Sequence, residues 1–178
     1  MSNVLIGIIG VILFIGLAVA GALFLAPRFS DTKSASTAAA TVQAVAQLAA
    51  AVTYANADQA QRAPAGFDTA DLVAGRYLQS VPTNPGGGDA LLLLTDGGEV
   101  SGPVAGLVVA RLSTDAASKT CGAIVRQTEN GTDRIGTDDF PVADNVSSIP
   151  RGPAGCFKVG ASGINDLDAN QFYAFARI

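Results

Sequence analysis

Residues 4–26 read VLIGIIGVILFIGLAVAGALFLA, a run without a single charged side chain. At a rise of 1.5 Å per residue, a helix of this length spans roughly 34 Å, which is enough to cross the ~30 Å hydrocarbon core of a bilayer. Apolar residues fall on every side of such a helix, whereas a surface helix carries one apolar stripe. The segment is therefore expected to lie in lipid or to be enclosed by protein.

Three explanations compete for this apolar helix. A cleavable secretory signal has a basic start and a shorter apolar stretch, but residues 1–3, Met-Ser-Asn, contain no Lys or Arg. A simple signal anchor needs nothing beyond the apolar run. An assembly helix is first held in a membrane and later packs among copies of itself, and Gly7, Gly10, Gly16 and Gly21 favour close approach of helices.

The junction after the apolar run predicts a break in the helix. Pro27 has no amide hydrogen to donate, and a proline disfavours helical backbone at the residue before it. Gly16 and Gly21 lower helical stability in the preceding turns. We therefore expect a non-helical or stretched segment between Gly16 and Arg28, with helix on both sides.

A second helical half is predicted over residues 30–57, where alanine, the strongest helix former, dominates. Its apolar residues recur at spacings of three and four, which predicts one buried face, while the two glutamines and a tyrosine fall on the other. The apolar face consists of Val42, Val45, Leu48, Ala49 and Val52, and the opposite face carries Gln43, Gln47 and Tyr54. A simple signal anchor does not require this continuation, so it favours an assembly helix that carries a head.

The remaining residues predict a mixed head. A short helix is expected over residues 68–76, and a longer one from a cap at Ser113 or Thr114 to about residue 128. Strands are expected over residues 91–95, 104–112, 155–160 and 172–178. We predict an α+β fold in which a long N-terminal helix, with an apolar half (1–27) and an amphipathic half (28–57), packs on the small antiparallel sheet of a head (58–178).

Composition argues against an enzyme and against a nucleic-acid-binding protein. The 178 residues include no His, which is the commonest general base and metal ligand, and the formal net charge is −4 with no basic run. The pair Asp138 and Asp139 has only its proximity to support a catalytic role. The sequence predicts no cofactor and no metal.

Four further patterns have simpler explanations than ligand binding. Residues 165–170, NDLDAN, lack the glycine and the closing glutamate of a calcium loop and are expected to form a turn. Glycines 86–88 are not followed by the Lys and Ser or Thr of a phosphate-binding loop. Asn130 and Asn145 begin sequences that match glycosylation signals, and we interpret both as polar loop residues.

The order of these features resembles that of the type IV pilins over the whole chain. An apolar N-terminal helix, an amphipathic continuation and an α/β head with two cysteines follow one another. Residues 77–86, YLQSVPTNPG, are similar to the pilin loop from helix to sheet, and residues 119–125, KTCGAIV, resemble the helix that bears the first head cysteine in type IVb subunits. A mature chain that begins with Met1 is also similar to the type IVb branch.

The resemblance implies a filament subunit. It implies that prepilin peptidase removes a leader, that Met1 becomes a methylated N-terminus, and that the subunit waits in the inner membrane until the pilus assembly machinery builds an extracellular homopolymer. It further implies that the apolar half packs in the filament core through Leu5, Ile9, Ile12, Phe14, Leu17 and Phe24. Surface attachment, motility, DNA transfer and phage attachment are the uses it implies, without selecting among them.

One position departs from the family pattern. Pilins usually carry a glutamate as the fifth residue of the mature chain, where this sequence has Leu5. Either the numbering does not begin at the mature N-terminus, or Ser2 and Asn3 solvate the terminal amine. A minor pilin or a pseudopilin of a secretion system, and a monomeric membrane-anchored module that faces the periplasm, remain alternatives.

The two cysteines, Cys121 and Cys156, are expected to form a disulfide, because a membrane-targeted head faces an oxidising compartment. Two reduced, buried thiols are the alternative. On the chain-entropy model, closure of a loop of about 35 residues stabilises the fold by about 3–4 kcal/mol.

Overall fold

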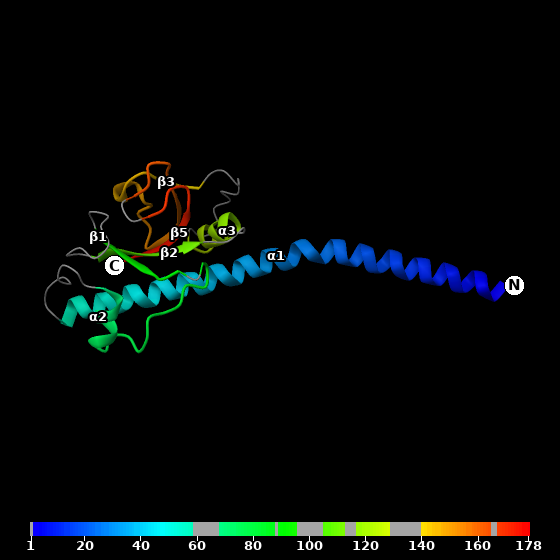
Figure 1. The fold of residues 1–178 in the computed structure, drawn as a ribbon, viewed down its shortest axis with the longest axis horizontal. Helices are drawn as coiled ribbons and strands as arrows, with labels where there is room; N and C mark the ends of the chain where they lie inside the picture. Colours follow the sequence, from blue (N-terminus) through cyan, green and yellow to red (C-terminus); the bar gives the residue numbers. More distant parts are fainter. Residues whose placement is uncertain are drawn as a thin grey trace. The chain divides into compact units, whose positions relative to one another are not determined.

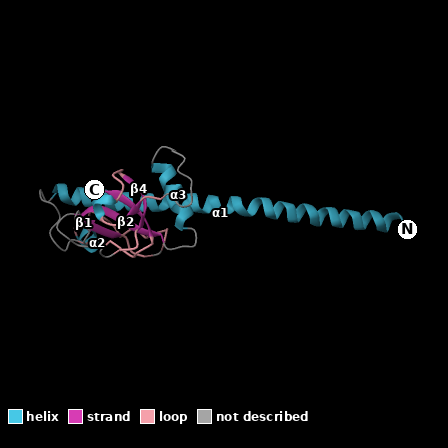
Figure 2. Ribbon diagram, turned by 90° about the horizontal axis from the view of Figure 1, so that it is seen from above, coloured by secondary structure: helices cyan, strands magenta, loops and turns pink. Residues whose placement is uncertain are grey.

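The computed structural model describes residues 2–58, 68–87, 89–95, 105–112, 117–128, 140–164 and 167–178. Two compact units divide the chain, Met1–Lys33 and Ser34–Ile178. The first unit is helical, and the second contains the rest of that helix with a small sheet and shorter helices, as Figures 1 and 2 show. The fold is α+β, as the sequence predicts.

Helix α1 runs from Ser2 to Asp58 without interruption, so the predicted break between Gly16 and Arg28 is wrong. Pro27 lies inside the helix, and its fixed φ of about −65° is itself a helical value. Its cost is local, whereas helix propagation adds a hydrogen bond for every residue fixed on either side. Strong helix formers around Gly16, Gly21 and Pro27 outweigh that cost.

The sheet has the strand order β1-β2-β5-β4-β3. Strands β1 (Leu92–Thr95), β2 (Ala105–Leu112), β5 (Phe172–Arg177) and β4 (Ala154–Val159) pair antiparallel, and these are the four strands predicted from the sequence. Strand β3 (Val142–Ala143) pairs parallel with β4 and was not predicted. Two residues are too few to show an alternating pattern.

Short helices follow the capping signals. Asp68 caps α2 (Thr69–Ala74), where its side chain accepts from the amides of Ala70 and Asp71 while the Asp71 carboxylate accepts from the Asp68 amide. Helix α3 spans Ala117–Thr128, and its predicted caps, Ser113 and Thr114, lie outside the described residues. A 3-10 turn, η1, covers Val146–Ser148.

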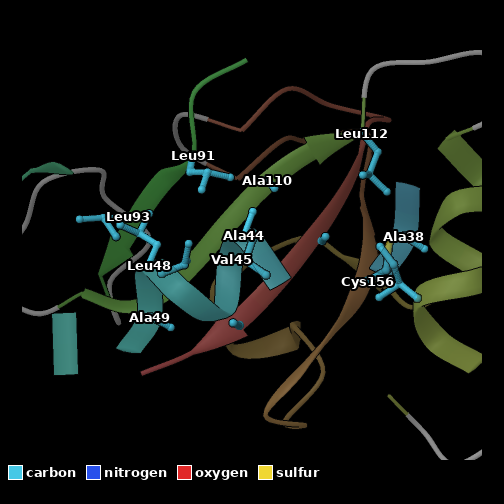
Figure 3. Close-up of a cluster of buried hydrophobic side chains, with 14 of the residues drawn as sticks. Ala38, Ala44, Val45, Leu48, Ala49, Leu91, Leu93, Ala110, Leu112 and Cys156 are labelled. Atoms are coloured by element: carbon cyan, nitrogen blue, oxygen red, sulfur yellow. The ribbon is translucent and has the colours of Figure 1, made fainter. Parts of the chain in front are cut away.

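Both faces of the sheet are covered by packed apolar side chains. One face packs on the second half of α1 and on α3, with the small side chains of Ala110, Ala174 and Ala176 turned inward. Figure 3 shows this cluster, with Ala44, Val45 and Leu48 of α1 among the strand residues. The small alanine side chains on the strands leave room for the larger side chains of α1 and α3 that pack on this face.

The opposite face of the sheet holds three aromatic side chains in contact with one another. Phe157, Tyr173 and Phe175 stack on this face, with ring centroids 5.9 and 6.0 Å apart for the two pairs that involve Phe157. Ile149 and Leu167 cover them from the connections that flank β4. Because both faces are buried, the strands read as nearly continuous apolar runs instead of alternating ones.

Candidate functional site: the apolar helix and its braced head

The apolar half of α1 exposes large side chains on every side within this chain. Ile9, Ile12, Phe14 and Leu17, four of the residues assigned to filament-core packing, are 49%, 63%, 74% and 73% exposed. Leu5, Phe24 and Met1 have side chains outside the described residues. Single exposed apolar residues are ordinary, but a contiguous surface of them marks a membrane or protein interface.

The four glycines of this half have no packing role within the chain. A Cβ added at Gly7, Gly10, Gly16 or Gly21 would meet no atom within 4 Å. Each glycine in a helix costs up to about 1 kcal/mol relative to alanine, and nothing in the chain offsets that cost. They are suited to close approach by another helix.

The second half of α1 belongs to the head. Val45, Leu48 and Val52 are fully buried in the core between helix and sheet, as the apolar periodicity predicts. At the C-terminal end of α1, the Tyr77 hydroxyl donates to the Asp58 carboxylate at 2.6 Å. The second half of α1 is therefore fixed to the head by its buried face and at its last residue.

Asn84 anchors the segment between α2 and β1. Its Nδ2 donates to the Arg111 carbonyl at 2.8 Å, and its Oδ1 accepts from the Gly86 amide at 3.0 Å. A Cβ at Gly86 would lie 3.1 Å from Thr41 Oγ1 of α1 and 2.5 Å from a Leu112 methyl carbon. The loop passes so close to α1 and β2 that a larger residue at position 86 would require the buried Leu112 side chain to shift.

The disulfide predicted from the sequence is present. It joins Cys121 of α3 to Cys156 of β4 with a Cα–Cα distance of 5.5 Å across 35 residues of sequence. Both residues are buried, and the bridge ties α3 to the sheet; Figure 3 shows Cys156 in the cluster between helix and sheet.

No local sequence pattern predicts the charged cluster that joins two loops of the head. The Arg111 guanidinium lies 3.0 Å from the Asp168 carboxylate and 3.5 Å from that of Asp89. The Asp168 amide donates to the Tyr173 hydroxyl at 3.0 Å. Burial raises the pKa of Tyr173 above 10.0 and outweighs the lowering by the hydrogen bond from the Asp168 amide. These contacts connect the loops that carry Asp89 and Asp168, and the Asp168 carboxylate is paired with Arg111.

The cluster does not make a metal site. Among the described residues, no group of three His, Cys, Asp or Glu side chains is placed to hold a metal ion. Asn165 and Asp166 lie outside the described residues, as do Asn130, Asp138 and Asp139. Asn145 caps η1, where its Oδ1 accepts from the Ser148 amide at 2.9 Å.

Within the described residues, helix α1 is long and apolar enough to cross a membrane. By length and composition the Asp31–Asp58 part of α1 passes that test, but much of its surface is buried on the head, and Gly7–Leu23 forms a shorter, exposed apolar stretch. The N-terminal apolar helix, the small sheet on which its second half packs and the disulfide are compatible with a pilin-like fold. Comparison with protein-family models, with curated proteins and with solved structures gave no match to this chain.

Proposed function

We propose that this chain is a structural subunit of an extracellular type IV pilus filament, nearest the type IVb pilins. The observation that carries the proposal is the exposure of apolar side chains all around residues 7–23, on the same helix whose second half packs on a disulfide-bonded head. Each large apolar side chain gains about 1.5–3 kcal/mol on full burial, so this surface requires cover.

A membrane and a filament core supply that cover in succession. The subunit waits in the inner membrane with its apolar half in lipid, and the assembly machinery then moves it into a helical polymer. Extraction loses little hydrophobic burial, because neighbouring apolar helices replace the lipid. Contacts between unlike surfaces of successive copies do not close into a ring and so generate a filament.

A monomeric, membrane-anchored binding module is the second candidate function. Leu5 favours it, because the acidic residue that the pilins carry at this position is missing. A minor pilin or pseudopilin shares the same helix and is distinguished by its abundance in the filament.

Electron microscopy of sheared surface material tests the proposal. Cells that express the chain with a pilus assembly machinery should release filaments that an antibody against the head labels along their whole length, and cells without the chain should not. Label confined to filament tips would indicate a minor subunit. Retention of all the chain in the membrane pellet, with no filaments, would favour the anchored module.

A further inference from the structure

An exposed aromatic ring and an exposed lysine follow the apolar run of α1. Phe29 is 68% exposed and comes three residues after the run 4–26 ends. Lys33, which is also exposed, lies four residues further along the helix, so the two side chains share one helix face. A ring beside a lysine suits the boundary between acyl chains and headgroups, where the ring stays in apolar surroundings and the ammonium group reaches polar ones.

The continuity of α1 places both residues at the level of the lipid headgroups. At a rise of about 1.5 Å per residue, Phe29 lies about 4.5 Å and Lys33 about 10 Å beyond Ala26 along the helix. Each headgroup layer is roughly 5–7 Å thick, since the whole bilayer measures ~40–45 Å and its hydrocarbon core ~30 Å. Side chains of a helix lean toward its N-terminus, so the Lys33 ammonium group reaches back into the layer that holds Phe29.

The charge at this level selects the kind of lipid. Residues 28–33 contain two basic residues and one acid, a net charge of +1. Arg28 and Asp31 have opposite charges and are neighbours on a helix surface, so Lys33 supplies the excess positive charge. Anionic lipids attract a lysine close to the membrane surface, whereas a zwitterionic headgroup offers it no net charge.

We propose that Phe29 and Lys33 bind the headgroups of anionic phospholipids in the leaflet through which α1 leaves the membrane. The Phe29 ring lies at the edge of the acyl chains, and the Lys33 ammonium group pairs with lipid phosphate. This contact holds the apolar helix at one depth while the subunit waits for assembly. The inference rests on the membrane stage of the proposed function and names the lipid that the subunit contacts there.

A single tryptophan can report the depth of position 29, because the chain contains no Trp of its own. The full chain with Phe29→Trp is placed in phosphatidylcholine vesicles whose acyl chains carry bromine either near the headgroup or near the bilayer centre. We expect shallow bromine to quench this tryptophan more strongly than deep bromine. The matched variant Leu13→Trp, at an exposed position in the middle of the apolar run, should show the reverse order. Stronger quenching at position 29 by deep bromine would overturn the proposal.

Energy transfer from the same tryptophan measures which lipid gathers beside Lys33. The acceptor is a trace of phosphatidylglycerol or of phosphatidylcholine, each with the same dansyl label on its acyl chain, in a phosphatidylcholine bilayer. We expect the Phe29→Trp chain to show about fivefold more of the anionic than of the zwitterionic acceptor in its surroundings. Adding Lys33→Gln should make the two nearly equal, whereas Lys33→Arg should keep the preference. Lys119→Gln, the same change at an exposed lysine of α3, should have no effect.

These outcomes separate the lipid contact from the proposed filament. Equal transfer to both lipids, or a preference that survives Lys33→Gln, would refute the contact and leave the filament standing. Absence of filaments in the microscopy of sheared material, together with a retained lipid preference, would overturn the filament alone. Carbonate extraction and circular dichroism should show that each variant inserts and keeps its helix, so that a lost preference reports the lost charge.

Discussion

Tyr173 shows how a single buried hydroxyl makes stability depend on pH. Its pKa is raised above 10.0, mainly by burial, so the folded chain retains the phenolic proton after the unfolded chain has released it. The neutral form is favoured in the fold, and its contribution is complete below pH 10 and is lost as pH rises through the folded pKa.

We predict that the free energy of unfolding of the full chain in detergent falls above pH 10, by up to about 1.4 kcal/mol per pH unit for this group. Tyr173→Phe should lose about 1 kcal/mol at pH 7, because the Asp168 amide loses its acceptor, and should show a shallower decline at alkaline pH. Urea titrations between pH 7 and 11 measure both effects. Parallel pH profiles for parent and variant would contradict this assignment.

Replacement by alanine should have opposite effects on stability at two glycines of the head. Gly86→Ala should destabilise the fold by about 1–3 kcal/mol, because the new methyl group would meet both Leu112 and Thr41. Gly122→Ala should stabilise α3 by up to about 1 kcal/mol, because its Cβ would come no closer than 3.9 Å to the Phe140 ring. Thermal unfolding compares the melting temperatures of the two variants. Equal changes for both would show that residue 86 has more room than its contacts with Leu112 and Thr41 indicate.

At the scale of elements, the continuity of α1 changes what Pro27 is expected to do. Because the helix already passes through Pro27, Pro27→Ala should add no helical residues, while it raises helix stability by up to about 3 kcal/mol. Gly21→Ala is the matched control and should raise it by about 1 kcal/mol. Circular dichroism in detergent during heating measures both. A clear gain in helix content at low temperature for Pro27→Ala alone would indicate that the parent chain has a non-helical segment at Pro27.

The disulfide joins two elements, α3 and β4, that otherwise meet through side-chain packing. Replacing both Cys121 and Cys156 by serine should lower the free energy of unfolding by about 3–4 kcal/mol, because the unfolded chain regains the freedom of the closed loop. Denaturant titration of the full chain measures the loss. The helix content of residues 7–23 should not change, and a parallel loss there would show that the bridge supports more than the head.

At the scale of the whole molecule, the apolar half should decide membrane association by itself. The double variant Ile12→Lys, Leu17→Lys should leave the membrane fraction, because each lysine near the middle of a membrane helix costs about 2.5–3.5 kcal/mol. Two lysines placed at Ala161 and Ser162, in an exposed turn, form the control and should not change the distribution. Carbonate extraction of membranes separates the two. Retention of the double helix variant would show that another surface holds the chain.

The sequence by itself determined the features that local patterns specify. Apolar residues on all sides of 4–26 predicted a helix that lies in lipid or is enclosed by protein. Spacings of three and four placed Val45, Leu48 and Val52 inside, and Asp68 marked the start of α2. Of the five strands in the described residues, four followed from their apolar runs. Each of these signals acts within a few residues, so it can be recognised in a single stretch of chain.

Only the tertiary structure decided which distant residues meet. It set β5, the last strand, between β2 and β4, and brought Arg111 to both Asp89 and Asp168. It also showed that the helix continues through Pro27, where the sequence predicted a break. Propagation of the helix on both sides outweighs one missing hydrogen bond. Pairing of strands and loops far apart in sequence depends on the summed burial of the whole core, and no local pattern contains that sum.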